Sequence, residues 1–134
     1  MSGSETITVT GSGSAADLNT INGSTSELVT ATSVTTITSS AVSDMLTLIS
    51  KRGTSGDKIN LATNYAVTLS DGTLSAANVK LVNADNGTGT INIASATSIS
   101  GTISDVLEIV NNTNSTFTTA ANYAVTISDG TATA

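Results

Sequence analysis

An internal repeat constrains the fold of this sequence more than any other feature. Residues 64–73 (NYAVTLSDGT) return as residues 122–131 (NYAVTISDGT), and residues 59–63 (INLAT) return as residues 91–95 (INIAS). Apolar residues follow the same repeat in two series, one of Val29, Ile59, Ile91 and Phe117 and one of Ile7, Ile37, Val67, Ile99 and Val125. Their spacing gives a period of about 30 residues, which is typical of proteins built from stacked repeats.

Within each unit, a second pattern predicts a short helix. Apolar residues stand two positions before, one after and four after each of four polar residues, Asp17, Asp44, Asn78 and Asp105. This spacing places the apolar side chains on one face of a helix. A hydroxyl side chain near the start of each helix is expected to cap it: Ser14 in the first, Ser40 or Ser43 in the second, Ser75 in the third and Thr102 in the fourth.

Each unit therefore contains, in order, a strand, a corner, a second strand and a short helix. Strands that recur once per unit, with a crossover between them, pair in parallel, and such crossovers are right-handed. The predicted fold is mainly β, a right-handed parallel β-solenoid with about 30 residues per coil, two β faces and one face of short helices. An all-β sandwich is the alternative fold, but it does not explain the helical pattern. In the solenoid, Asn60 lies above Asn92 in an amide ladder, and one column contains Ile7, Ile37, Val67, Ile99 and Val125.

The repeat also divides the chain into coils. Residues 1–4 are expected to be a flexible start, and residues 5–134 a single solenoid domain. Its coils are expected at roughly 5–27, 28–58, 59–89 and 90–116, with a partial coil at 117–134. Because the first and last coils are incomplete, open strand edges are expected at both ends, and such edges are templates for further strands. The expected partners are further copies of the chain or neighbouring repeats, stacked end to end.

The composition supports an ordered chain and excludes several partners. The apolar residues are nearly all aliphatic, the 26 Thr residues favour extended backbone, and charged residues make up only 10%, unlike in disordered chains. The net charge is −6, and the four cations are Lys51, Arg52, Lys58 and Lys80, which argues against nucleic acid and anionic membranes as partners. No apolar run is long enough to span a membrane, so membrane insertion is not expected.

The sequence offers no convincing active site, so no enzyme activity, catalytic residue, metal site or cofactor is predicted. His and Cys are absent, which excludes the catalytic triads and thiolate metal sites that need them. A Ser–Lys dyad needs a desolvated lysine, whereas Lys51, Lys58 and Lys80 stand in polar surroundings. Asp71 and Asp129, each followed by Gly, are expected to form turns, and weak Ca²⁺ binding is the alternative role.

Three further motifs have simple explanations. Residues 11–14 (GSGS) resemble a phosphate-binding loop but lack its lysine, so a strand-to-helix turn is expected. Thr6, Thr8 and Thr10 alternate as in ice-binding solenoids, but this row does not persist in later coils. Motifs for N-glycosylation arise by chance in a chain so rich in Ser and Thr; they begin at Asn22, Asn86, Asn111 and Asn114.

Residues 14–19 (SAADLN), 34–38 (VTTIT) and 66–71 (AVTLSD) resemble the repeats of giant secreted surface proteins of marine cyanobacteria and other bacteria, which are described as adhesin- or hemagglutinin-like. The resemblance implies an extracellular or cell-surface location and a repetitive structural role, and it assigns no catalytic or binding residue. The expected function is a non-enzymatic structural module of an adhesin, a surface layer or a self-assembling fibre. The alternative is a solenoid that binds a ligand, either a glycan or ice.

Overall fold

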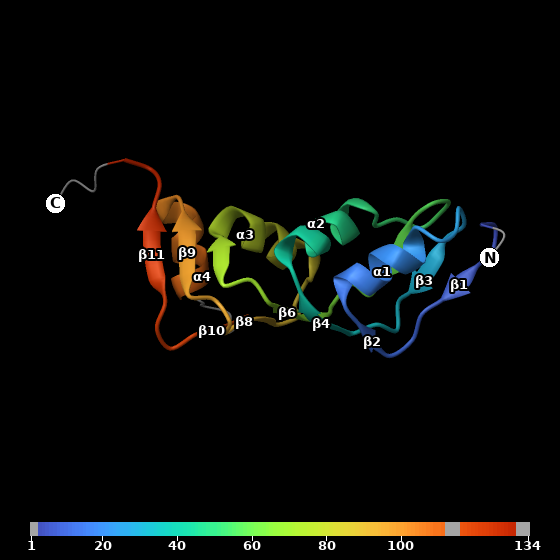
Figure 1. The fold of residues 1–134 in the computed structure, drawn as a ribbon, viewed down its shortest axis with the longest axis horizontal. Helices are drawn as coiled ribbons and strands as arrows, with labels where there is room; N and C mark the ends of the chain where they lie inside the picture. Colours follow the sequence, from blue (N-terminus) through green and yellow to red (C-terminus); the bar gives the residue numbers. More distant parts are fainter. Residues whose placement is uncertain (1–2, 112–115, 131–134) are drawn as a thin grey trace.

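The computed structural model describes residues 3–111 and 116–130 as an elongated body, with β1 and β11 at opposite ends (Figure 1). Five units follow one another along it, and each of the first four ends in a helix. The first unit contains β1 (Ile7–Thr8), β2 (Ser12–Gly13) and α1 (Ala15–Asn22), and the second contains β3 (Val29–Ala31), β4 (Thr36–Ser40) and α2 (Val42–Ser50). The third contains β5 (Ile59–Leu61), β6 (Ala66–Leu69), β7 (Thr73–Ser75) and α3 (Ala76–Asp85). The fourth contains β8 (Ile91–Ile93), β9 (Ser98–Gly101) and α4 (Ile103–Asn111), and the fifth contains β10 (Phe117–Thr119) and β11 (Ala124–Ile127).

All four helices form where the apolar spacing predicts them. The apolar residue directly after the repeated polar residue is buried in every helix. These residues are 0% to 4% exposed: Leu18, Met45, Val79 and Val106. Each helix packs on the next along the row, α1 on α2, α2 on α3 and α3 on α4. Helices this short are marginal in water, so this packing against neighbours and core is what stabilises them.

Two of the four predicted helix caps are present. The Ser14 hydroxyl accepts a hydrogen bond from the N–H of Asp17 at 3.1 Å, and the Thr102 hydroxyl accepts one from the N–H of Asp105 at 3.2 Å. The predictions for the other two helices are wrong. Ser75 precedes α3 without a side-chain capping bond, and α2 begins after Ala41, which has no side-chain acceptor.

Every strand pair of residues 3–111 and 116–130 is parallel, as expected, but these strands form three sheets and not two. The first sheet has the order β1-β3-β5, the second β10-β8-β6-β4-β2 and the third β11-β9-β7. Helices occupy about as much of the described chain as strands do, so the fold is mixed α/β and the expectation of a mainly β fold is wrong. Such short strands are stable here because each one pairs with neighbouring strands in a sheet.

The predicted single column of apolar residues is also wrong. Ile7 pairs with Val29 and not with Ile37, and Val67 pairs with Ile91 and not with Ile99. Only two steps of the predicted column are real, from Ile37 to Val67 and from Ile99 to Val125. The amide ladder is absent as well, since Asn60 pairs with Thr30, and Asn92 pairs with Thr68 and Thr118.

The strands change sheets at the third unit, which contributes one strand to each of the three sheets. After α3, the loop 86–89 lies against residues 63–65, between β5 and β6: the N–H of Thr88 donates to the Asn64 side chain at 2.9 Å, and the Asn86 side chain donates to the Tyr65 carbonyl at 3.2 Å. A Cβ on Gly89 would lie 1.8 Å from that carbonyl oxygen, so only Gly fits there. The chain therefore enters the fourth unit beside β6, and the first sheet ends at β5.

One aliphatic core runs through all the units. Its fully buried members come from every sheet and helix layer, and they include Ile37, Leu48, Ile59, Ile91 and Ile109. Each such side chain contributes roughly 1.5–3 kcal/mol when removed from water. At the first unit, the Gly3 carbonyl accepts a hydrogen bond from the N–H of Ser26 at 2.7 Å.

Candidate functional site

A side chain at or just after the end of the second strand of a unit caps the helix of the unit before it. The Asp71 carboxylate accepts a hydrogen bond from the N–H of Val42 at 2.8 Å, and the Asp129 carboxylate accepts one from the N–H of Ile103 at 2.8 Å. The Ser40 hydroxyl does the same for the N–H of Ala15 at 2.8 Å. Each of these side chains accepts a hydrogen bond from an N–H group that would otherwise be free at the start of a helix. The capping residue is distant in sequence from the helix that it caps.

Gly101 occupies the corresponding place at α3, where a Cβ would lie 2.9 Å from the Cβ of Ala76. This close contact leaves no room for a capping side chain at α3. Asp71 and Asp129, which were expected to form turns or to bind Ca²⁺ weakly, thus cap the helices α2 and α4 with their carboxylates. Within residues 3–111 and 116–130, no group of three or more Asp or Glu side chains could hold a metal ion.

A partly buried polar cluster lies where the first sheet ends. The Asp85 carboxylate accepts hydrogen bonds from the Arg52 guanidinium at 2.6 Å and from the Tyr65 hydroxyl at 2.7 Å. Arg52 also donates to the carbonyl oxygen of Ala62 at 3.2 Å, just after β5. Burial, together with the Asp85 carboxylate, raises the pKa of Tyr65 far above its usual range. The three side chains are paired with one another and Tyr65 is 1% exposed, so the cluster is suited to holding the sheet edge and not to binding a reactant.

This cluster was not predicted from the sequence, although a signal exists. Arg52 is the single arginine of the chain, and Tyr65 is one of two tyrosines. The chain consists mostly of Thr, Ser and aliphatic residues. A residue type that is rare in it, such as Arg or Tyr, therefore indicates a place where the repeat is interrupted.

Lys51 and Lys80 lie in ion pairs, as their polar surroundings suggest. Lys80 donates to the Asp105 carboxylate at 2.7 Å, and hydrogen bonds to Asp105 and Glu108 raise the pKa of Lys80. Lys51 donates to the Asp57 carboxylate at 3.0 Å. A lysine base needs a lowered pKa, so the direction of the change at Lys80 is opposite to what a Ser–Lys dyad requires.

The remaining motifs fall in ordinary structural places. Residue Gly11 has φ +86° and leads into β2, and Ser14 caps α1, as expected for a turn. Thr6, Thr8 and Thr10 are exposed, but beside Thr8 the first sheet offers Thr30 and then Asn60, which is not a regular threonine row. Asn22 and Asn86 are buried, Asn111 is exposed at the end of α4, and Asn114 lies outside the described residues.

The end of the body near β11 exposes apolar side chains. We call this set the end face; its exposed fractions lie between 42% and 46%, and its members are Ile103, Leu107, Val110, Val125 and Ile127. The counterparts of Ile103 in the first three helices are 0% to 7% exposed. Val125 pairs with Ile99, which is fully buried in the same sheet. The end face is therefore core surface that one more unit would cover.

Leu107 and Val110 occupy helix positions that contact the following helix elsewhere in the row. In α3 the same positions are Lys80 and Asn83, whose side chains reach Asp105 and Glu108 on α4 at 2.7 and 3.5 Å. In α2 they are Leu46 and Ile49, which are half-buried against the core. On α4 both are apolar and nearly half exposed. The exposure of Leu107 and Val110 was not predicted from the sequence, because the helical pattern gives no sign of which face has a neighbour.

No known protein family, curated protein or solved structure matches this chain. Among the helices of the described ranges, none is long and apolar enough to cross a membrane.

Proposed function

We propose that this chain is a non-enzymatic structural module of an extracellular surface protein, which assembles end to end through the end face. The module is a right-handed parallel solenoid in which each unit forms one coil. Parallel pairing of strands from successive units, with a helix in each connection, supports this arrangement, because such crossovers are right-handed almost without exception. The likeness to bacterial surface repeats supports the extracellular location.

The observation that carries the proposal is the end face itself. Five aliphatic side chains are nearly half exposed at positions whose equivalents are buried or contact the next unit. Contiguous apolar surface of this kind marks interaction sites. Within the described residues, β10 and β11 are the outermost strands of the second and third sheets beside it, next to β8 and β9, and an outermost strand is a template for a further strand.

The opposite end of the body is a suitable partner for the end face. There β1 and β2 are the outermost strands of the first and second sheets, and among the strands of the described residues they pair with β3 and β4. Ile7, Val9 and Ile21 are half-buried at this end. Parallel strands at one end and parallel strands at the other allow copies to join head to tail, and a head-to-tail interface that does not close produces a filament.

The test is a measurement of mass against concentration. Sedimentation over about three orders of magnitude in concentration, with electron microscopy of the densest samples, is expected to show growth from monomers to linear filaments. Val110→Lys places a charge in the end face, and we expect it to weaken association by about tenfold or more.

Leu81→Lys is the matched control. Leu81 lies on α3, is 55% exposed and is not part of the end face, so the same substitution there is expected to leave assembly unchanged. A wild-type chain that stays monomeric at all concentrations would contradict the proposal. So would equal effects of the two substitutions.

A further inference from the structure

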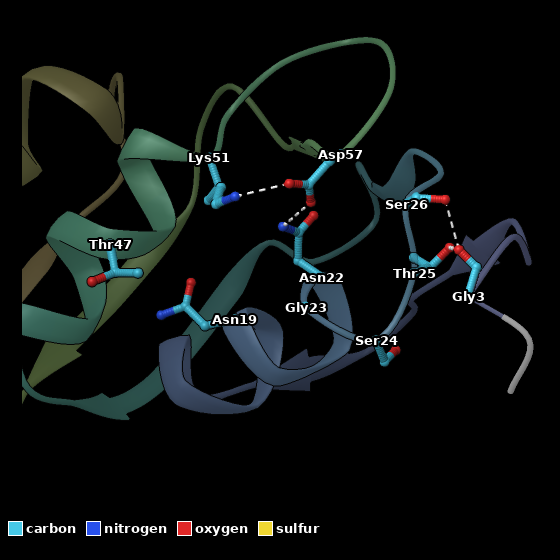
Figure 2. A pocket seen from close by; sticks show the side chains of 10 residues that line it. All are labelled: Gly3, Asn19, Asn22, Gly23, Ser24, Thr25, Ser26, Thr47, Lys51 and Asp57. Carbon is cyan, nitrogen blue, oxygen red and sulfur yellow. Dashed lines mark hydrogen bonds and ion pairs between the residues drawn. The ribbon is translucent and has the colours of Figure 1, made fainter.

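A polar hollow lies between α1, α2 and the loop 53–58 (Figure 2). The side-chain oxygens of Asn19 and Asn22 are buried beneath its surface, so a ligand in the hollow could reach only the exposed pair of Lys51 and Asp57 and the hydroxyls around it. An exposed ion pair contributes little to binding. The outer face of the second sheet offers a ligand many more contacts.

The second sheet directs two rows of side chains outward, and its strands follow one another along the lower edge of the body in Figure 1. Its inward column is 0% to 6% exposed and contains Ile37, Val67, Ile91 and Phe117. Because side chains alternate along a strand, the residues before and after each member of this column point away from the core. The row before the column contains Ser12, Thr36, Ala66, Thr90 and Thr116. The row after it contains Thr38, Thr68, Asn92 and Thr118.

These rows consist mainly of hydroxyl side chains. Seven of the nine are Ser or Thr, the exceptions being Ala66 and Asn92, and all nine are half-buried or exposed. The register shifts between Ile37 and Ser40, so Thr38 lies less regularly than the others. We call this set of nine residues the threonine face; it shares no residue with the end face.

The threonine face exists only because the strands change sheets at the third unit. Thr36 stands at the second strand of its unit, whereas Thr90 and Thr116 stand beside the first strands of theirs. The pairing of Val67 with Ile91 places both kinds of strand in one sheet. A row of threonines that is interrupted when the units are aligned by sequence is therefore continued in the folded chain.

The charges of the chain lie elsewhere. The net charge is −6, yet the strands of the second sheet and the residues beside them contain no Asp, Glu, Lys or Arg, over residues 9–14, 33–40, 63–70, 87–94 and 116–120. Calcium minerals present cations, whose usual protein ligands are carboxylates. The threonine face has no carboxylate, so it is suited to a neutral surface and not to an ionic one.

Aromatic side chains are absent from the threonine face as well. Tyr65 and Phe117 are buried, Tyr123 packs against the core, and the chain has no other aromatic residue. The sugar rings of a crystalline polysaccharide would therefore meet none of the flat aromatic area that favours such contacts.

The spacing of the hydroxyls favours ordered water. Neighbouring members of a row are about 4.8 Å apart, and the two rows are about 6.6 Å apart along the strands. Both repeats are similar to distances between oxygen atoms in the surface planes of ice. Each threonine hydroxyl donates and accepts hydrogen bonds, and its branched side chain is stiff, so little side-chain freedom is lost when water around it becomes ordered.

We propose that the threonine face binds ice. Thr68 lies at its centre, since β6 is the middle strand of the five. Water held along the two rows continues into the ice lattice, and the methyl groups between the hydroxyls exclude water that does not fit it. This activity is separate from end-to-end assembly and does not depend on it.

The test is the growth of ice in solutions of the whole chain. We expect thermal hysteresis, a gap between the melting and freezing points of a single ice crystal, and enrichment of the chain in polycrystalline ice grown slowly from solution. Thr68→Lys places a charge at the centre of the face. We expect it to lower the fraction bound to ice by about tenfold or more, because the ice surface hydrates a charge poorly.

Thr30→Lys is the matched control. Thr30 is also half-buried and points outward from β3, the middle strand of the first sheet, so the change in charge and in strand propensity is the same. Circular dichroism compares the folding of the two variants. If Thr68→Lys does not fold, Thr36→Lys replaces it, because Thr36 is exposed on the same face.

Each outcome decides the proposal. Enrichment in ice that persists in Thr30→Lys and is lost in the variant of the threonine face supports it. Absence of both hysteresis and enrichment in the wild-type chain overturns it, and so does an equal loss, or no loss, in the two variants. Retention on particles of crystalline cellulose or calcium carbonate, without enrichment in ice, would identify a different occupant and overturn it too.

Discussion

The Asp71 carboxylate accepts a hydrogen bond from the N–H of Val42 at 2.8 Å, so the end of β6 caps a helix that belongs to the preceding unit. The same relation joins Asp129 to Ile103 and Ser40 to Ala15. Each cap therefore connects two units and contributes to the interface between them. In repeat proteins such interface energies determine how far unfolding spreads from one unit to the next.

Removing the cap of α2 is expected to destabilise the chain. Asp71→Ala leaves the N–H of Val42 without its acceptor, and we expect a loss of about 1 kcal/mol in the free energy of unfolding. Urea denaturation followed by circular dichroism measures it. Asp71→Asn keeps an acceptor oxygen and is expected to retain most of the stability. Equal losses in the two variants would show that the effect comes from the charge and not from the capping bond.

Gly89 is expected to tolerate no side chain. A Cβ there would overlap the backbone carbonyl of Tyr65, which cannot move aside as a flexible side chain could. Gly89→Ala is therefore expected to cost about 3 kcal/mol, at the upper end of the cost of overpacking. Gly13→Ala is the control, because a Cβ on Gly13 meets nothing within 4 Å. Thermal unfolding of the two variants compares them, and similar melting temperatures would contradict the close contact of loop 86–89 with Tyr65.

The Tyr65 hydroxyl is expected to make stability depend on pH in the alkaline range. Burial and Asp85 raise the pKa of Tyr65 in the folded chain, whereas an unfolded tyrosine ionises near pH 10. The extra stability is complete below pH 10 and is lost as the pH rises above it, since the unfolded chain then releases the proton more readily. Tyr65→Phe should remove this alkaline dependence and cost about 1–2 kcal/mol at neutral pH. Urea denaturation across this pH range tests it, with Tyr123→Phe as the control.

Lys80 is expected to govern the titration of Asp105. Its hydrogen bond lowers the pKa of the Asp105 carboxyl, with a smaller contribution from Thr102. A lowered pKa contributes stability that is present above pH 4 and is lost as the pH falls below it. In Lys80→Met, the pKa of Asp105 should rise toward its usual value, and NMR titration of the carboxyl carbon measures this directly. Lys58→Met should leave it unchanged; an unchanged Asp105 in Lys80→Met would refute the assignment.

Salt is expected to promote end-to-end assembly. The cations stand between residues 51 and 80, whereas Asp17 lies toward one end of the body and Glu108 and Asp129 toward the other. The two ends therefore repel each other at low ionic strength. Raising the ionic strength from about 0.01 to about 0.15 M shortens the range of this repulsion from about 30 to about 8 Å. Sedimentation at both salt concentrations measures the mass, and weaker association at high salt would point to ion pairs in place of apolar contacts.

The helices and most strands could be predicted from the sequence because both patterns depend on neighbouring residues. The apolar residues around Asp44 and Asp105 specify which face of a short helix is buried, and the strands at Ile59 and Ile91 begin where the repeat places them. This local pattern is still visible where the repeat units differ in sequence, because the buried positions of each helix and strand are still apolar.

The stacking register could not be predicted in the same way. Similar spacing along the sequence made Val67 and Ile99 look equivalent, although Val67 pairs with Ile91. The change depends on the close approach of Gly89 to Tyr65, which is a contact between loops distant in sequence. The stretch between Val67 and Asn78 is longer than that between Ile37 and Asp44, and this extra length, which contains β7, was the available signal.

The candidate sites depended still more on tertiary contacts. The end face consists of residues that a helical pattern assigns to the core or to a neighbour, and their exposure follows from which unit comes next. Asn22 matched a glycosylation motif, but its burial against the loop 53–58 gives it a different environment. Neither the exposure of the end face nor the burial of Asn22 can be predicted from the neighbouring residues in the sequence.

The third unit alone supplies strands to all three sheets, and this has a consequence for how such a protein changes length during evolution. If a whole unit is duplicated or deleted before β5 or after α3, the remaining strands still have neighbours in their own sheets. Losing the third unit would leave β9 without β7 and β8 without β6. Recombination can therefore lengthen or shorten either arm, while the segment from Ile59 to Asp85 has to be inherited intact.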